Sequence, residues 1–254
     1  MTIMIILSLF LATQFIGLTA NNIFLETELP YSLQPPDIEP TISPWFFITM
    51  LIIISVFFLV MKRFRLEIFM KVWFFFAFLV TVAITLSAFI DPGMALIVSL
   101  AIVVLKFKEH DLYVHNMGEL LIYGGVVALF APVLNFWAAV ILLIGISVYD
   151  YVAVFITKHM VELAKMTEKM GIFSGLLVVN GDEVAILGGG DIAFTLLFAV
   201  VALREFGMTS ALFAIYGATI FIGILMLIGK KKKYYPAMPF VTAGTLLGFL
   251  ISLI

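Results

Sequence analysis

The chain has 254 residues, of which 64% are hydrophobic and only 12% are charged, and its formal net charge is −2. A soluble domain is about 45–50% apolar and about 25% charged, so this composition excludes an ordinary soluble protein and indicates one that crosses a membrane several times. The chain contains no cysteine, which excludes disulfides, thiolate metal sites and cysteine nucleophiles.

The apolar segments predict nine membrane-spanning helices, if each is taken as about 20 apolar residues. They cover residues 3–20, 44–61, 68–89, 94–105, 117–131, 136–157, 188–203, 211–228 and 236–254. Short charged loops separate them and leave no room for a soluble domain. We therefore expect an all-α polytopic membrane protein that forms one membrane domain over residues 1–254.

Two of these segments are unusual. The first, residues 3–20, ends in a sequence that could pass for a signal-peptide cleavage site, but no Lys or Arg precedes it. Because a signal peptide needs a basic start, we expect a retained helix. The fourth, residues 94–105, reaches only about 18 Å at about 1.5 Å per residue. Such a short span needs protein around it or a locally thinner bilayer.

The connection between the sixth and seventh helices has two parts. Residues 158–171 alternate apolar and charged side chains with a helical period, which predicts a helix on the membrane surface. Residues 175–187 then contain two β-prone runs around Asn180-Gly181, a strong local signal for a hairpin. A plain loop leading into the seventh helix remains the alternative.

The basic residues predict the orientation of the bundle, because cytoplasmic loops carry an excess of Lys and Arg. With the N-terminus inside, 13 of the 14 basic residues fall on the inner side and only Arg204 falls outside. The C-terminus is then expected outside. The run Lys230–Lys233 is expected to bind lipid headgroups.

Two acids lie deep in the predicted spans. Asp150 precedes Lys158 by eight residues, and Asp191 precedes Arg204 by thirteen. At about 1.5 Å per residue in a core about 30 Å thick, both carboxyls lie roughly 10–12 Å from the inner boundary. The sixth and seventh helices run in opposite directions, so the acids match in depth. If the helices touch, Asp150 and Asp191 form a carboxylate pair.

Such a pair has a defined chemistry. Two neighbouring carboxyls cannot both ionise easily, so the pair shares a proton near neutral pH, as in soluble aspartic proteases. The ionised group can deprotonate a water that attacks an amide carbonyl, while the protonated group polarises that carbonyl. No metal or other cofactor is required, and we expect none.

Short motifs surround the two acids. Gly188, Gly189 and Gly190 let a substrate backbone or another helix come close to Asp191, although ordinary helix packing also uses such glycines. Tyr149 precedes Asp150 and either hydrogen-bonds a carboxylate or merely packs. The third motif, Pro236-Ala237-Met238, opens the ninth helix and leaves backbone groups unpaired at the depth of the acids. An ordinary helix start with proline fits the same residues.

Together these motifs resemble those of a known family. Tyr149-Asp150, Gly188-x-Gly190-Asp191 and Pro236-Ala237-Met238 are similar to the Y-D, G-x-G-D and P-A-L motifs of the presenilin and signal peptide peptidase family of intramembrane aspartyl proteases. The resemblance covers the whole chain, and the predicted orientation is similar to that of presenilin. Met238 stands where the family usually has Leu, a volume-conserving change.

The resemblance implies hydrolysis of single transmembrane helices, with Asp150 and Asp191 as the catalytic pair. It also implies that Tyr149, Gly188–Gly190 and Pro236–Met238 shape the substrate site. The short loop between helices six and seven resembles a prokaryotic or archaeal version, so we expect a prokaryotic cell membrane and no accessory subunits or nucleic acid. A homo-oligomer is compatible with the sequence. The segment 175–187 could offer an edge for an unwound substrate strand.

Two alternatives stay open from the residues. Prepilin and preflagellin peptidases also have a G-x-G-D aspartate, but usually with a basic residue two positions later, where this chain has Ala193. A proton or cation transporter could use buried acids as a relay. Glu119, near the start of the fifth helix, is predicted to be an interfacial charge.

Overall fold

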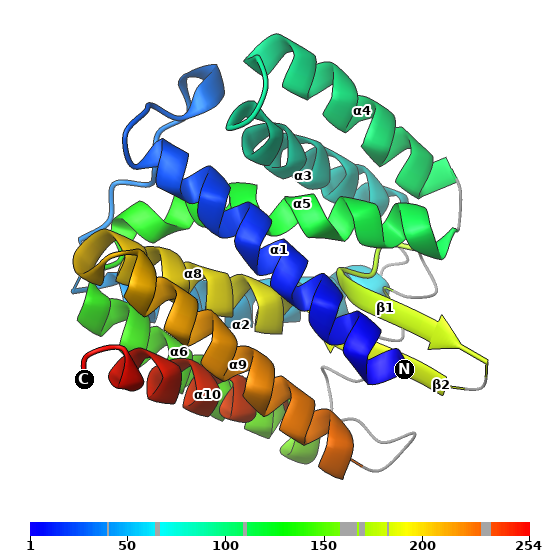
Figure 1. Ribbon diagram of the computed structural model, residues 1–254. Helices are drawn as coiled ribbons and strands as arrows, with labels where there is room; N and C mark the ends of the chain where they lie inside the picture. Colours follow the sequence, from blue (N-terminus) through cyan, green and yellow to red (C-terminus); the bar gives the residue numbers. More distant parts are fainter. Residues whose placement is uncertain are drawn as a thin grey trace.

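The computed structural model describes residues 1–39, 41–63, 67–108, 111–157, 167, 171–181, 183–229 and 235–254. Within them the chain forms nine α-helices and one two-stranded sheet (Figure 1). The helices are α1 (Thr2–Phe24), α2 (Ser43–Arg63), α3 (Glu67–Ser87), α4 (Pro92–Lys108), α5 (Leu112–Phe130), α6 (Phe136–Tyr151), α8 (Gly189–Phe206), α9 (Met208–Ile228) and α10 (Met238–Ile251). The strands are β1 (Gly175–Asn180) and β2 (Glu183–Gly188).

Helix α8 lies at the centre of the bundle. It packs against α1, α5, α6, α9 and α10, and all its side chains from Thr195 to Leu203 are buried. A helix that is apolar all round belongs in such a position. In Figure 1, α3, α4 and α5 lie on one side of α8, α9 and α10 lie on the other, and α1 crosses in front.

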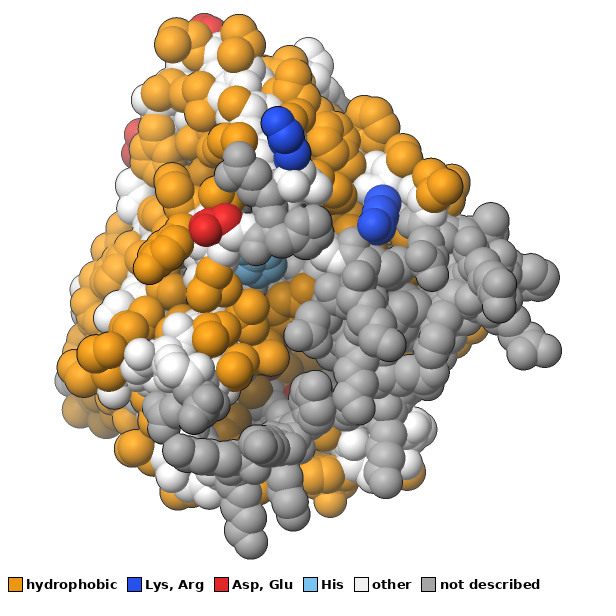
Figure 2. Space-filling model, turned by 90° about the vertical axis from the view of Figure 1, so that its right-hand side faces the viewer, with side chains coloured by type: hydrophobic (Ala, Val, Ile, Leu, Met, Phe, Trp, Pro, Cys, Tyr) orange, Lys and Arg blue, Asp and Glu red, His pale blue; other side chains and the backbone are white. Residues whose placement is uncertain are grey.

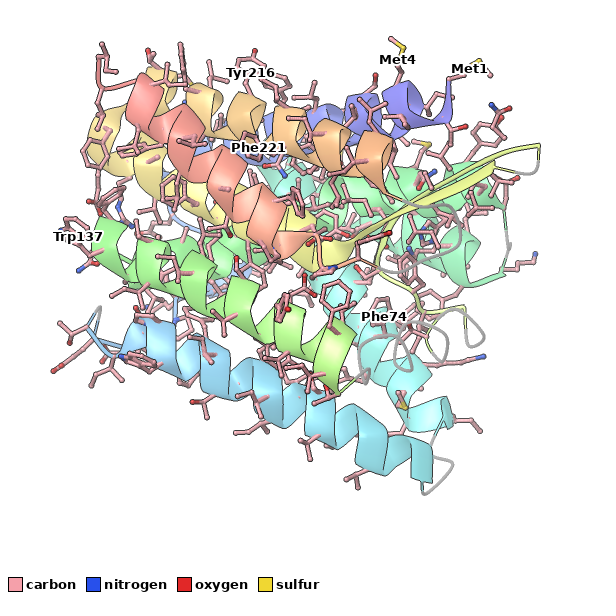
Figure 3. The ribbon with its side chains drawn as sticks, turned by 90° about the horizontal axis from the view of Figure 1, so that it is seen from below. Met1, Met4, Phe74, Trp137, Tyr216 and Phe221 are labelled. Carbon is pink, nitrogen blue, oxygen red and sulfur yellow. The ribbon has the colours of Figure 1, made fainter. Side chains whose placement is uncertain are left out.

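The two ends of the bundle differ. The hairpin and the N-terminus lie at one end, and the C-terminus lies at the other (Figure 1). Figure 3 shows Trp137, at the start of α6, far from Met1 and Met4. Helix α6 therefore runs towards the hairpin end, where α8 begins. Helix α2 lies at the edge of the bundle beside α6.

Within the described residues, five segments are long and apolar enough to cross a membrane: Thr2–Phe24, Ile68–Ser87, Leu112–Val133, Phe136–Ile156 and Met208–Ile228. The mainly helical class is therefore confirmed, whereas nine spans, a single membrane domain and the orientation stay predictions. The expectation of a very short fourth helix was wrong, because α4 has 17 residues and reaches about 25 Å. Pro92 begins the helix and Lys106 and Lys108 form its last turn.

Some predicted boundaries were also wrong. Helix α5 begins at Leu112 rather than at residue 117, because the Asp111 carboxylate accepts hydrogen bonds from the N–H groups of Tyr113 and Val114. An aspartate in this position satisfies backbone donors that the helix itself leaves unpaired. Helix α10 begins at Met238 and ends at Ile251, inside the predicted 236–254.

Of the two alternatives for residues 175–187, the hairpin is present, as a pair of antiparallel strands. Gly175 is opposite Gly188 and Asn180 is opposite Glu183, so Asn180 is paired within β1 and the turn begins one position later than the Asn180-Gly181 pair suggests. Gly181 has a φ of 59°, a conformation that glycine adopts without strain. The predicted surface helix over 158–171 lies almost entirely outside the described residues.

Glycines allow α9 and α10 to touch backbone to backbone. A methyl group on Gly244 would collide with the Gly217 carbonyl oxygen and would lie 2.7 Å from Cβ of Phe221, which is labelled in Figure 3. A methyl group on Gly248 would likewise collide with the Phe213 carbonyl oxygen. Close approach through small residues is a common basis of helix association in membranes.

We expect Gly244→Ala to lower the free energy of unfolding by about 1–3 kcal/mol, because backbone atoms cannot move aside as a side chain can. The matched control is Gly223→Ala on α9, where the new methyl would meet only the end of the Leu7 side chain at 3.3 Å. Thermal unfolding in detergent measures both. Equal midpoints for the two variants would show that α9 and α10 are not held this closely.

Candidate active site

Asp150 lies in the last turn of α6. The helix begins at Phe136, where the Asn135 side chain accepts a hydrogen bond from the Ala138 N–H at 2.8 Å. After Tyr151 the chain continues through a π-helical turn, Val152–Ile156. Such wider turns occur often at functional sites. The Asp150 side chain is half-buried, so it is neither sealed in the core nor fully exposed.

Asp191 is the third residue of α8, directly after the hairpin. Gly188 ends β2 and also caps the helix. The first turn of a helix carries unpaired N–H groups and the positive end of the helix dipole, which favours a nearby carboxylate. The Asp191 side chain is half-buried, and its Oδ2 lies 3.2 Å from the position that a Cβ on Gly188 would occupy.

The structure brings the two acids together at the hairpin end of the bundle. Helix α6 packs against α8, as the sequence argument required. The carboxyls of Asp150 and Asp191 lie close enough for their charges to interact. Two acids from helices that run in opposite directions therefore form one polar site within an apolar bundle.

The third motif completes this site. The Met238 backbone N–H, at the start of α10, donates to Asp150 Oδ2 at 3.1 Å, and the Ala237 N–H also interacts with this carboxyl. Pro239 lies in the first turn of α10, as in an ordinary helix start with proline. The third motif is therefore both a helix start and a part of the site that contacts Asp150. Pro236 and Met238 are buried. The start of α10 thus presents backbone donors to an acid on α6.

Hydroxyl groups fix the start of α10 on α6. Ser147, one turn before Asp150, donates to the Thr242 hydroxyl at 2.7 Å and contacts the Met238 carbonyl at 3.2 Å. Thr242 Oγ1 lies 3.3 Å from the Leu143 carbonyl oxygen. Because these bonds join the two helices beside the motif, they set where the Met238 N–H points.

The three glycines before Asp191 lie in different surroundings. Gly189 is closely packed, since a methyl group there would lie 2.9 Å from both the Tyr123 hydroxyl and Ser174 Oγ. Gly190 is exposed, and a methyl group there would meet nothing nearer than the Phe194 ring at 3.9 Å. Gly189 therefore serves packing, whereas Gly190 leaves open space next to Asp191.

Tyr149 is directed to α2. Its hydroxyl forms a hydrogen bond of 2.8 Å with Ser55 Oγ. Its phenol is also close enough to Asp150 for an electrostatic interaction. The sequence left the choice between a carboxylate bond and packing open, and the Ser55 contact was not foreseen.

Glu119 is not an interfacial charge, so that prediction was wrong. Its side chain is fully buried and accepts from Lys106 Nζ at 2.6 Å and from the Tyr123 hydroxyl at 2.5 Å. It also accepts from Ser174 Oγ at 3.1 Å and from the Gly175 N–H at 2.8 Å. Four donors from three parts of the chain thus meet one carboxylate.

Sequence reasoning missed this cluster beside Asp191. The available signal was an ionisable residue within an apolar helix, which marks a functional site by default. His115, Asn116, Glu119 and Tyr123 also follow the spacing of one face of a helix. Among the described residues, no three His, Cys, Asp or Glu side chains gather as a metal ion requires.

The chain matches the family described as signal-peptide peptidase, presenilin aspartyl protease over residues 7–183, well over half its length. This range includes Asp150, whereas Asp191 and the third motif lie beyond it. No curated protein matches the chain.

Solved structures resemble the chain over its full length. A presenilin-family intramembrane aspartate protease in a C222 crystal form has a TM-score of 0.71 at 23% identity, with 100% of this chain and 99% of that chain covered. A P2 crystal form of such a protease has the same score and identity, with 98% and 96% covered. These likenesses show a shared fold. Together with the family match, they establish that the chain belongs to the signal-peptide peptidase and presenilin family of aspartyl proteases.

Proposed function

We propose that this protease hydrolyses peptide bonds inside transmembrane helices and that Asp150 and Asp191 are its catalytic pair. The observation that carries the proposal is that the two carboxyls lie within electrostatic range of one another beside the first turns of α8 and α10. Each acid comes from a different helix, and backbone N–H groups of a third helix contact one of them. The family match favours this function over the prepilin-peptidase and transporter alternatives.

The chemistry needs only water and the two acids. The ionised carboxylate takes a proton from water while the oxygen attacks the amide carbon, and the protonated carboxyl donates to the carbonyl oxygen. The tetrahedral intermediate then collapses, the C–N bond breaks and the nitrogen leaves with a proton from the pair. Backbone donors at Ala237 and Met238 keep the Asp150 carboxylate oriented through these steps.

The substrate is proposed to reach the site as an extended strand along β2. Leu177 directs both its N–H and its carbonyl to the Asn116 side chain, so this residue faces away from β2. Its partner Ile186, and Val184 two residues before, therefore direct their backbone groups away from β1. A substrate strand can pair with this outer edge next to Asp191, which satisfies its own backbone groups away from water.

The setting is proposed from the family match and from the distribution of basic residues in the sequence. The substrates are proposed to be single-pass membrane proteins or peptides, and the protein to lie in a prokaryotic cell membrane with its N-terminus inside. The short connection between α6 and β1 supports a prokaryotic source. No accessory subunit is proposed.

Cleavage of a single-span peptide, labelled at both ends and reconstituted in liposomes with the protein, tests the function. We expect products whose new ends, located by mass spectrometry, fall inside the hydrophobic segment. The control is the same peptide with charged residues placed through that segment, which should not be cut because it no longer inserts. Cuts confined to the flanking tails would contradict the proposal, and ion flux into the liposomes without cleavage would favour a transporter.

A further inference from the structure

Lys106, Glu119, Tyr123 and Ser174 form a largely buried polar cluster beside Asp191, here called the Glu119 cluster. They come from α4, α5 and the residue before β1. The side chains of Lys106 and Glu119 are 2% and 0% exposed. Lys106 Nζ also lies 4.5 Å from the centre of the Phe78 ring. Hydrophobic side chains predominate among the described residues on the face at the hairpin end (Figure 2). A charged pair that is almost fully buried in such a molecule requires an explanation.

The cluster fixes the base of the hairpin on α5. Glu119 accepts from the Gly175 N–H at 2.8 Å, and His115 bonds the Gly175 carbonyl at 2.9 Å. Leu177 follows Gly175 by two residues. The Asn116 side chain donates to the Leu177 carbonyl at 2.7 Å and accepts from the Leu177 N–H at 3.0 Å. Side chains of one helix thus occupy the outer edge of β1, which leaves the edge of β2 for a partner.

The same cluster reaches the start of α8. The Tyr123 hydroxyl, bonded to Glu119, lies 3.3 Å from Ser174 Oγ. The Ser174 carbonyl accepts a hydrogen bond of 3.2 Å from the Gly189 N–H. Gly189 begins α8, packs against both hydroxyl groups and precedes Asp191 by two residues. The Tyr123 phenol is also within electrostatic range of Asp191.

We propose that Glu119 and Tyr123 are positioning residues, which hold the first turn of α8 so that Asp191 meets Asp150 and the substrate strand in a reactive geometry. A buried carboxylate is tolerated only when its acceptor sites are filled and its charge is paired. Lys106, Tyr123, Ser174 and Gly175 meet this condition in one arrangement. The network therefore allows little freedom to the segment that carries Asp191. This inference rests on the proposed function.

The main test is Tyr123→Phe, which removes one hydroxyl and leaves the ring. We expect kcat for the labelled peptide to fall on the order of tenfold with KM nearly unchanged, because small errors in the placement of a reacting group are costly. Tyr113→Phe is the matched control, since it removes a hydroxyl from the same helix where the side chain is 81% exposed. Its kcat should equal that of the wild type.

Two further measurements separate positioning from loss of folded protein. A non-cleavable analogue of the peptide, with a tetrahedral hydroxyl-bearing carbon at the cleaved position, should bind Tyr123→Phe about tenfold more weakly, in proportion to kcat/KM. A partly unfolded sample would instead bind fewer molecules at unchanged affinity. The double variant Lys106→Met with Glu119→Gln removes both charges together, so it avoids an unpaired buried lysine and should fold with a similarly reduced kcat.

Each outcome has one meaning. If Tyr123→Phe equals Tyr113→Phe in kcat, or loses only binding sites for the analogue, the positioning role is wrong. If Asp150→Asn or Asp191→Asn still cleaves the peptide, the proposed function itself is wrong. The two failures are therefore distinguishable in one set of assays.

Discussion

Asp150→Asn and Asp191→Asn will each lower the rate of peptide cleavage by about 10³-fold or more, because each removes a group that must give or take a proton. Asparagine has nearly the same shape as aspartate, so packing at the ends of α6 and α8 is preserved. It can also accept the hydrogen bond that the Met238 N–H donates to Asp150. The measurement is cleavage of the labelled single-span peptide, with thermal unfolding in detergent as the check on folding.

Asp111→Asn is the matched control for these substitutions. Asp111 caps α5 by accepting from two backbone N–H groups, and asparagine caps helices as well as aspartate does. This variant should cleave at the wild-type rate. The double variant Asp150→Asn with Asp191→Asn should be no slower than either single one, because the pair acts as a unit. An additive further loss in the double variant would contradict a shared mechanism.

Much of the site could be read from the sequence because its signals are local. A charge inside an apolar run stands out whatever surrounds it, so Asp150 and Asp191 were found without knowledge of the fold. With a plain loop as an equal alternative, the hairpin was likewise suggested by neighbouring residues alone. Its exact turn was not, because the pairing of Asn180 with Glu183 shifts the connection by one residue.

The errors at Lys106, Glu119 and the end of α4 share a physical cause, which is contact between distant parts of the chain. Lys106 and Glu119 look like charges at helix ends, but each is buried because the other neutralises it. Helix α4 appeared short for the same reason, since its last turn contains Lys106, a residue that usually ends an apolar span. Four donors around Glu119 lie on three separate segments, so periodicity within one segment cannot reveal them.

Ile186→Pro will lower kcat/KM for the peptide by about tenfold or more if the substrate pairs with β2. The Ile186 N–H points away from β1, so proline removes a donor from the outer edge and leaves the ladder between the strands intact. The substrate carbonyl opposite then lacks a partner in an apolar setting, which costs about 1–3 kcal/mol. Ile186→Ala retains the N–H and should cleave at close to the wild-type rate, which isolates the backbone effect.

The chain offers an internal control for this edge. Val179 and Val184 are opposite one another in the hairpin, with side chains 49% and 57% exposed. Both direct their N–H groups outward, Val179 at the edge of β1 and Val184 at the edge of β2. Val184→Pro should therefore slow cleavage. Val179→Pro places a proline in the same residue pair of the hairpin but at the edge of β1, so it should not slow cleavage. If both slow it equally, the hairpin matters only for its own stability and the substrate strand lies elsewhere.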